Sequence, residues 1–252
     1  MDFNRRFGGI ARLYGGRALG VFSSAHVCII GIGGVGSWTV ESLARSAIGN
    51  LTLVDMDHVA ESNVNRQLPA MSETLGKAKI RVMEKRVHSI NPSATVHLLD
   101  DFISLENIPE VITDDFDYVI DCIDSFRIKA ELIAHCRRNS INLITTGGAG
   151  GQIDPTRIRV SDLSRTEQDP LLAKTRRQLR QKYGFARNPR RRFGVPAVWS
   201  DEPLRQIVDA PDVCEGSPGS ALNCGGLGSC TPVTAGFGMT AAAHVLERLA
   251  NS

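Results

Sequence analysis

A glycine-rich turn near residue 31 constrains the fold of this 252-residue chain more than any other feature. The run GIGGVGS, residues 31–37, follows an apolar stretch and precedes a pattern of helical periodicity. In a strand, tight turn and helix in this order, the backbone N–H groups of the turn point toward the start of the helix. The positive end of the helix dipole lies there too, so the site suits a phosphate. The alternative is a turn without a ligand. As nucleotide-binding residues we expect Gly31, Gly33, Gly34, Gly36 and Ser37.

Short apolar runs alternate with longer amphipathic stretches over the first 145 residues. The pattern predicts strands at 26–30, 51–54, 95–99, 118–120 and 141–145, with helices at 36–47, 77–90 and 126–138. Alternating strands and helices favour an α/β fold with a Rossmann-like, doubly wound, mainly parallel sheet. We therefore expect a nucleotide-binding domain over residues 1–151.

The pattern weakens after residue 151, where we expect a carboxy-terminal extension that completes the same fold over 152–252. A strand is predicted at 157–160, a basic amphipathic helix at 168–182, an exposed arm at 187–192 and a closing helix at 231–249. The stretch 216–243 has no charged residue, but it is rich in Gly, Ser, Thr and Asn and too short in apolar content to span a membrane.

The residues after the turn distinguish two kinds of nucleotide. Asp55 ends the second predicted strand, at the distance where dinucleotide enzymes place a ribose-binding carboxylate, so an NAD(P)-dependent oxidoreductase is one alternative. Arg66 and Lys79 follow closely, and two cations suit a triphosphate better than a nicotinamide. Asp124 follows a further strand and reaches the same sheet edge, where a hard oxygen ligand suits Mg²⁺.

The segments GIGGVGS, DMDHVAESNVNRQ, GKAK and DCIDS together resemble the ATP-binding core of the ubiquitin-activating-enzyme-like superfamily, which includes ThiF and MoeB. The resemblance implies ATP and Mg²⁺ as cofactors and activation of a carboxylate. It implies that Asp55 holds the ribose, that Asn63, Arg66 and Lys79 contact phosphates, and that Asp124 binds Mg²⁺. It also implies a homodimer in which an amino-terminal arginine reaches the neighbouring ATP. This chain has glycine at the usual position, which leaves Arg5, Arg6 and Arg12 as candidates.

The net charge of +2 conceals two opposed regions. Residues 157–192 carry 12 Lys and Arg against 3 Asp and Glu, whereas the rest of the chain carries 17 against 24. The overall balance excludes a histone-like protein, but the local excess suits an RNA backbone, with a solvated charged face as the alternative. The candidate residues for binding such a backbone are Arg176, Arg177, Arg180, Lys182, Arg187, Arg190, Arg191 and Arg192.

The six cysteines contain no C-x-x-C pair, which indicates neither a zinc site nor a disulfide framework and favours a cytoplasmic protein without a secretion signal. Members of the superfamily that activate a ubiquitin-like sulfur carrier usually have such pairs. The segments RFGGIARLYG, TTGGAGGQIDPTRIRVSDLSRTEQDPLLAK and VTAGFG instead resemble the tRNA threonylcarbamoyladenosine dehydratase family.

That resemblance implies ATP-dependent cyclisation of threonylcarbamoyladenosine next to the anticodon of tRNA. Cys224 is a candidate covalent relay, although ring closure within one nucleoside does not require one. The glycine-rich segment 147–151 is a candidate lining of the acceptor pocket. A cysteine desulfurase or sulfur acceptor is a further possible partner. The alternatives are an adenylyltransferase acting on a sulfur carrier, an NAD(P)-dependent oxidoreductase and a non-catalytic RNA-binding module.

Overall fold

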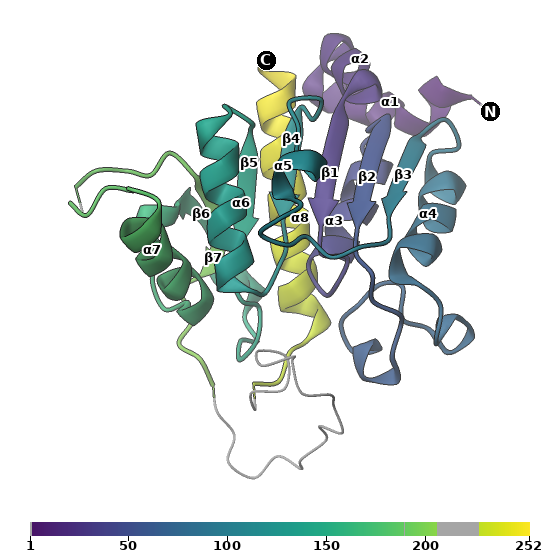
Figure 1. Cartoon of the computed structure of the whole chain (residues 1–252). Helices are drawn as coiled ribbons and strands as arrows, with labels where there is room; N and C mark the ends of the chain where they lie inside the picture. The colour runs from purple at the N-terminus through teal and green to yellow at the C-terminus, as the bar shows by residue number, and fades with distance from the viewer. Residues whose placement is uncertain (1, 189, 206–226) are drawn as a thin grey trace.

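A computed structural model describes residues 2–188, 190–205 and 227–252, and a seven-stranded sheet forms the centre of this part of the chain (Figure 1). The strand order is β3-β2-β1-β4-β5-β7-β6. Neighbouring strands are parallel except β6 and β7, which pair antiparallel. The strands are β1 His26–Ile30, β2 Asn50–Val54, β3 Thr95–Leu99, β4 Tyr118–Asp121, β5 Leu143–Thr146, β6 Ile158–Asp162 and β7 Pro196–Ser200.

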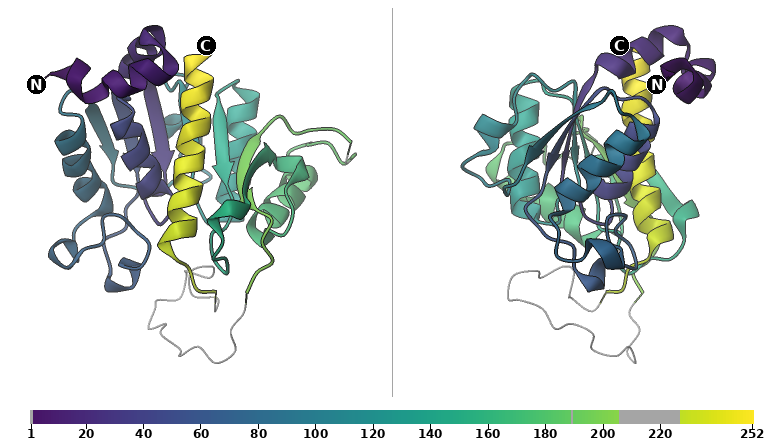
Figure 2. Two further views of the ribbon diagram at one scale, coloured as in Figure 1. Left: turned by 180° about the vertical axis from the view of Figure 1, so that it is seen from behind. Right: turned by 90° about the vertical axis from the view of Figure 1, so that its right-hand side faces the viewer.

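Helices cover both faces of the sheet, as the views in Figure 2 show. One face carries α3, α4 and α8, the other carries α5, α6 and α7, and α1 and α2 lie at the end where the strands begin (Figures 1 and 2). Their bounds are α1 Phe3–Tyr14, α2 Gly16–Ser24, α3 Gly36–Arg45, α4 Lys79–Ile90, α5 Ile108–Val111, α6 Phe126–Arg138, α7 Pro170–Lys182 and α8 Thr231–Ala250.

Alternate side chains of the central strands enter two separate cores. Val27 and Ile29 of β1 pack in the cluster that includes residues of α3, α4 and α8, whereas Cys28 and Ile30 pack in the cluster that includes residues of α5, α6 and α7. Strands buried on both faces are the reason that these runs are apolar throughout, as parallel sheets require. The doubly wound α/β prediction is therefore confirmed.

Strand β7, the amino-terminal helices α1 and α2 and the short helix α5 were absent from the sequence prediction. Strand β7 is five residues long, begins with Pro196 and directly follows the basic arm, so its own pattern is weak; pairing with β5 and β6 makes it a strand. The amino-terminal segment forms α1 and α2 although it contains several glycines, which lower helix propensity. Phe7 and Leu19 pack against Ala47, and the Asp2 carboxylate caps α1 through the Arg5 amide at 3.0 Å.

Among the described residues no helix is long and apolar enough to cross a membrane. The uncharged stretch 216–243 lies partly outside the described residues, and its remaining part comprises residues 227–230 and the first thirteen residues of α8, a helix that buries one side against the core. This helix packs against α3 and brings the carboxyl-terminal part of the chain beside the glycine-rich turn.

Candidate functional site

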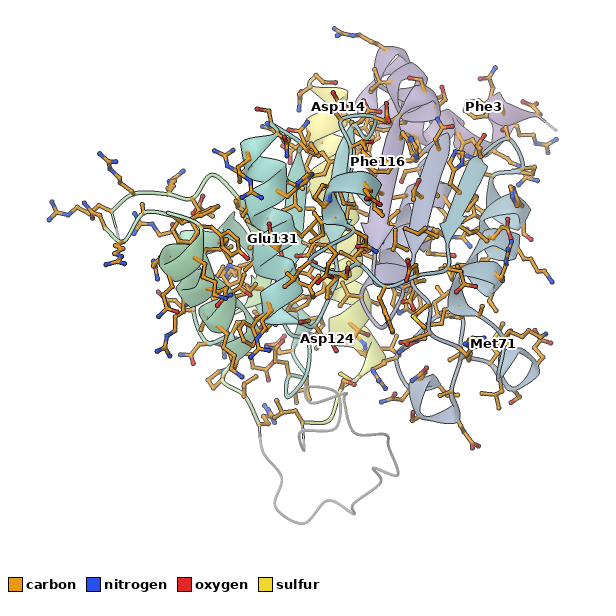
Figure 3. All side chains as sticks on the ribbon, in the orientation of Figure 1. Phe3, Met71, Asp114, Phe116, Asp124 and Glu131 are labelled. Carbon is orange, nitrogen blue, oxygen red and sulfur yellow. The ribbon has the colours of Figure 1, made fainter. Side chains whose placement is uncertain are left out.

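A cavity of about 320 Å³ opens at the carboxyl ends of β1, β2, β4 and β5. The loops after β1 and β4 diverge here, because β2 follows on one side of β1 and β4 lies on the other. Ligands of open α/β sheets bind in the crevice that forms at such a switch point. Figure 3 shows Asp124 at this lower end of the sheet, with Asp114 at the opposite end. The predicted nucleotide-binding residues that line the cavity are Gly31, Gly33, Gly34, Asp55, Arg66, Lys79 and Asp124.

The glycine-rich turn has the close packing that its sequence predicts. Gly31 has a φ of 87°, a conformation that favours glycine, and a Cβ on Gly36 would lie 1.8 Å from the Gly31 carbonyl oxygen. Gly36 and Ser37 are buried behind the cavity and do not line it. The Ser37 hydroxyl donates to the Gly33 carbonyl at 2.6 Å and accepts from the Leu68 amide at 3.2 Å. Ser37 therefore fixes the turn rather than facing a ligand.

Asp55 links the end of β2 to the turn after β1. One carboxylate oxygen accepts from the Ile32 amide at 2.6 Å, and the other accepts from the Asp57 amide at 2.7 Å. Burial raises the pKa of Asp55, although the nearby Lys79 ammonium and the two amides oppose that shift. A carboxylate oxygen has more than one lone pair, so each can still accept a hydrogen bond from a ligand hydroxyl.

Lys79 brings a nearly buried cation to the cavity. Its ammonium lies 2.8 Å from the Asp57 carboxylate, with 5% of the lysine side chain and 56% of the aspartate side chain exposed. Asp57 also lines the cavity, and the sequence analysis gave it no role. A buried lysine paired with an exposed carboxylate can exchange that partner for a phosphate without losing charge compensation.

Arg66 and Asn63 come from the loop between β2 and α4, but only Arg66 lines the cavity. The Arg66 guanidinium donates to the Ser62 carbonyl at 2.7 Å and to the Asn65 side-chain oxygen at 2.9 Å. Asn63 is buried, and its side-chain oxygen accepts from the Ala60 amide at 3.1 Å. In this structure Asn63 shapes the loop that presents Arg66.

Gln67 is a cavity residue to which the sequence analysis assigned no role. Its side chain is 7% exposed, and its Oε1 accepts no hydrogen bond from the described part of the chain. A buried acceptor without a donor costs about 1–3 kcal/mol. Because Gln67 lies beside the cavity, a bound ligand with a hydroxyl or amino group would relieve that cost, which fits a nucleoside.

Asp124 is exposed at the start of α6 and lines the cavity. The described residues contain no group of three or more His, Cys, Asp or Glu side chains that could hold a metal ion by themselves. Mg²⁺ at nucleotide sites is commonly held by one or two carboxylates together with substrate phosphates. One exposed carboxylate on a cavity that also has cations for phosphates fits that kind of site.

A fully buried ion pair stands behind Asp124. The Lys129 ammonium lies 2.8 Å from the Asp121 carboxylate, and the Thr145 hydroxyl donates to the same oxygen at 2.7 Å. The second carboxylate oxygen accepts from the Ile123 amide at 3.1 Å. These bonds join the ends of β4 and β5 to α6, and so they fix where the cavity-lining residues after both strands lie.

Among the cysteines that the structure describes, Cys122 lines the cavity. Burial raises its pKa to about 12, so its sulfur remains a thiol near neutral pH and not the nucleophilic thiolate. Cys224, the candidate relay, lies outside the described residues. From the glycine-rich segment 147–151, the cavity lining includes Gly147, Gly148, Ala149 and Gly150.

The basic residues divide into two kinds. Arg176 and Arg180 are half-buried: Arg176 donates to the Thr166 hydroxyl, and the Arg180 guanidinium lies 5.2 Å from the centre of the Phe193 ring. The others are exposed and lie at the end of the molecule that carries α7 (Figure 1). This exposed basic surface comprises Arg177, Lys182, Arg187, Arg190, Arg191 and Arg192, and the structure adds the exposed Lys174 of α7.

At the amino terminus, the arginines serve different purposes. The Arg6 guanidinium donates to the Ile90 carbonyl at 2.7 Å and to the Ser89 carbonyl at 3.3 Å, so it caps the end of α4 within the same chain. Arg5 and Arg12 are exposed on α1.

Comparisons with known proteins agree with this geometry. The ThiF family model matches residues 9–252. The tRNA threonylcarbamoyladenosine dehydratase of Haemophilus influenzae is 54% identical over 98% of this chain and 94% of its own length; that of Escherichia coli K12 is 48% identical with the same coverage. A crystal structure of the E. coli protein, TcdA, in complex with ATP has a TM-score of 0.88, at 47% identity over 98% of this chain and 94% of that chain.

A more distant relative, the molybdopterin-synthase adenylyltransferase of H. influenzae, is 31% identical over 48% of this chain and 50% of its own length. The similarity to the dehydratases thus extends over nearly the whole chain, including the basic region, whereas the similarity to that adenylyltransferase extends over about half. This chain belongs to the ThiF family, and within it to the tRNA threonylcarbamoyladenosine dehydratases.

Proposed function

We propose that this protein uses ATP to activate the carboxylate of threonylcarbamoyladenosine in tRNA and thereby cyclises that nucleoside with loss of water. The observation that carries the proposal is the cavity itself. It brings together the glycine-rich turn, the carboxylates of Asp55 and Asp124 and the cations of Arg66 and Lys79, in a chain 54% identical to a named dehydratase.

The polar residues that the motifs place on the cavity have proposed roles that follow from their chemistry. Backbone amides of the turn hold phosphate oxygens, Asp55 accepts from the ribose hydroxyls, and Arg66 and Lys79 compensate phosphate charge. Asp124 would hold Mg²⁺, which when bound neutralises charge on the phosphates. In this scheme Lys79 exchanges Asp57 for a phosphate when ATP enters.

The reaction requires activation because a free carboxylate has no adequate leaving group. A carboxylate oxygen bonds to a phosphorus atom of ATP, and the bond from that phosphorus to its bridging oxygen breaks, so that pyrophosphate departs if AMP is transferred and ADP departs if phosphate is transferred. The carbamoyl group of the same nucleoside then attacks the acyl carbon, the phosphorylated oxygen leaves with its electron pair, and a proton is released. The product lacks one water, and proximity supplies much of the acceleration because both reacting groups belong to one nucleoside.

The exposed basic surface is the proposed tRNA-binding face. Lysines and arginines that neutralise backbone phosphates release counterions and give affinity that depends strongly on salt. In this proposal the tRNA backbone binds at the exposed basic surface while the modified nucleoside enters the cavity, where the Gly147–Gly148 loop contacts it.

We also infer a cytoplasmic homodimer, with Arg5 or Arg12 as the arginine that reaches the partner's ATP. A cysteine desulfurase or sulfur acceptor remains a proposed partner, on the family resemblance alone.

A mass measurement on nucleosides tests the proposed reaction. The protein is incubated with ATP, Mg²⁺ and tRNA bearing threonylcarbamoyladenosine, and the tRNA is then digested under conditions that preserve the ring. We expect the modified nucleoside to lose the mass of one water and Asp124→Ala to abolish that change. Asp114→Ala, an exposed aspartate at the opposite end of the sheet (Figure 3), is the matched control and should remain active. An unchanged nucleoside in the presence of bound ATP would refute the proposal.

A further inference from the structure

Asp169 is a buried carboxylate on the cavity to which neither the motifs nor the proposed mechanism assigns a role. It is 3% exposed and lines the cavity together with Gly147 and Gly148. It is also the N-cap of α7, the helix that carries part of the basic surface. The residue therefore belongs at once to the nucleotide cavity and to the proposed RNA-binding helix.

The two oxygens of this carboxylate bind two different segments. Oδ1 accepts from the Leu172 amide in the first turn of α7 at 2.8 Å, and Oδ2 accepts from the Gly148 amide at 2.9 Å. Gly147 is held from the other side, because its amide donates to the Val198 carbonyl of β7 at 2.8 Å. A Cβ on Gly147 would lie 1.9 Å from Asp169 Oδ2, so the loop has no room for a side chain at this point.

This arrangement restricts independent movement of the helix and the loop. Hydrogen bonds of this kind need a separation near 2.7–3.2 Å, so a shift of α7 by about 1 Å must carry the Gly148 amide with it or break a bond to the carboxylate. A buried carboxylate that loses a donor is left with an unsatisfied charge, which is costly. A displacement of α7 is therefore transmitted to the cavity.

We propose that Asp169 is a positioning residue that couples RNA bound on α7 to the geometry of the Gly147–Gly148 loop, so that carboxylate activation proceeds at full rate only when RNA is engaged. The coupling rests on the proposed function.

Substitution by serine separates this role from helix capping. Serine is as good an N-cap as aspartate, so Asp169→Ser keeps a cap for α7 while removing the acceptor for Gly148. We expect kcat for dehydration to fall about tenfold or more, with KM for ATP and for tRNA within about threefold of wild type. We also expect tRNA to increase ATP turnover by the wild-type protein and not by this variant.

Asp162→Ser is the matched control. Asp162 likewise caps a following helical turn, through the Ser164 amide at 2.9 Å, and accepts from the Gly194 amide of a second loop at 2.7 Å, but it does not line the nucleotide cavity. Because that loop follows the basic arm, this variant should raise KM for tRNA and leave kcat nearly unchanged. Gly147→Ala, which displaces the intact Asp169 carboxylate, should reproduce the loss of kcat.

Three results would overturn the coupling. Wild-type kcat in Asp169→Ser would show that the residue is only a helix cap. Loss of ATP binding in that variant would show a direct ligand contact instead. If both the Asp162 and the Asp169 variants lost kcat in proportion to their loss of thermal stability, the role of Asp169 would be a general structural one. If the wild-type protein itself forms no dehydrated nucleoside, the proposed function fails and the coupling fails with it; if the wild type is active, only the coupling is at stake.

Discussion

The cavity region and the basic surface are built in opposite ways. Around the cavity, Asp55, Asp169 and Ser37 are each held by backbone hydrogen bonds, and Lys79 is nearly buried. On the basic surface, most of the cationic side chains are exposed. Chemistry on a phosphorus atom depends on groups fixed in place, whereas attraction to an RNA backbone tolerates mobile charges. The difference predicts that substitutions near the cavity affect folding and rate, and that substitutions on the basic surface affect affinity.

The largest effect should come from the buried pair behind the cavity. Lys129→Met leaves the Asp121 carboxylate in a fully buried position without its cation. Breaking such a pair on one side typically costs about 3–5 kcal/mol, so we expect the free energy of unfolding in urea to fall by that amount. Arg138→Met removes the pair of an exposed arginine with the partly buried Glu131 and should change the free energy of unfolding by about 1 kcal/mol or less. Equal losses in the two variants would contradict the proposed difference in burial.

The next effect concerns the turn. In Gly36→Ala the new methyl group would overlap the Gly31 carbonyl oxygen, so the turn must open. A displacement of about 1 Å can cost about 100-fold in rate, and we expect a loss of that size in kcat/KM for ATP. Gly20→Ala in α2 is the control, because a Cβ there meets no neighbouring atom and alanine favours a helix. Nucleotide titration and steady-state kinetics of both variants measure the difference.

The basic surface should give a smaller effect of another kind. Replacing Arg190, Arg191 and Arg192 by serine removes three exposed cations without disturbing the cavity. Each phosphate contact contributes roughly 0.7–0.9 to the slope of log affinity against log salt, so three lost contacts should lower that slope by about 2. Affinity for tRNA should fall and affinity for ATP should not change. An unchanged slope would show that these arginines form only a solvated face.

The sequence motifs contain most of the residues that were proposed as nucleotide ligands and that the structure places on the cavity, because these residues follow strands locally. Gly31 and Asp55 follow strands with clear apolar patterns, and parallel strands bring such positions to one sheet edge. Gln67 and Asp169 were harder to predict, because their roles depend on what surrounds them in three dimensions: an acceptor without a donor, and a carboxylate shared by two segments. The burial of Asn63 and Ser37 likewise depends on packing that no local pattern records.

The same reasoning explains the weaker prediction of the basic half. Strand β7 exists because β5 and β6 supply partners, which are distant in sequence. The charge excess in residues 157–192 was visible, but burial divides it: Arg176 and Arg180 contribute to packing, whereas Lys174 joins the exposed basic surface. The charge excess of a segment therefore predicts the class of partner, but only the folded structure shows which of its charged side chains are exposed and can contact that partner.

The smallest effect concerns acid sensitivity in the region behind the turn. Glu41 of α3 accepts from Arg86 of α4 through both carboxylate oxygens, at 2.6 and 2.9 Å, and from Arg45 at 2.7 Å. Burial acts to raise the pKa of Glu41, but the hydrogen bonds and charges of the two arginines outweigh it and leave the pKa below its usual value. Its stabilising contribution is therefore present above the unfolded-state pKa, near 4.5, and is lost as pH falls through the lower folded-state pKa.

Glu41→Gln should lower the free energy of unfolding by about 1 kcal/mol at neutral pH, a modest value because both arginines are partly exposed and water screens the pair. The difference between wild type and variant should shrink as pH falls below about 4.5, because the Glu41 carboxylate of the unfolded chain then takes up a proton while that of the folded protein, with its lower pKa, still resists protonation. Glu84→Gln breaks a weaker pair, 3.5 Å from Arg81, and is the control with the smaller expected change. A difference that grows in acid would mean that Glu41 is stabilised by burial in its protonated form, and that the α3–α4 contact behind the turn is not an ionic one.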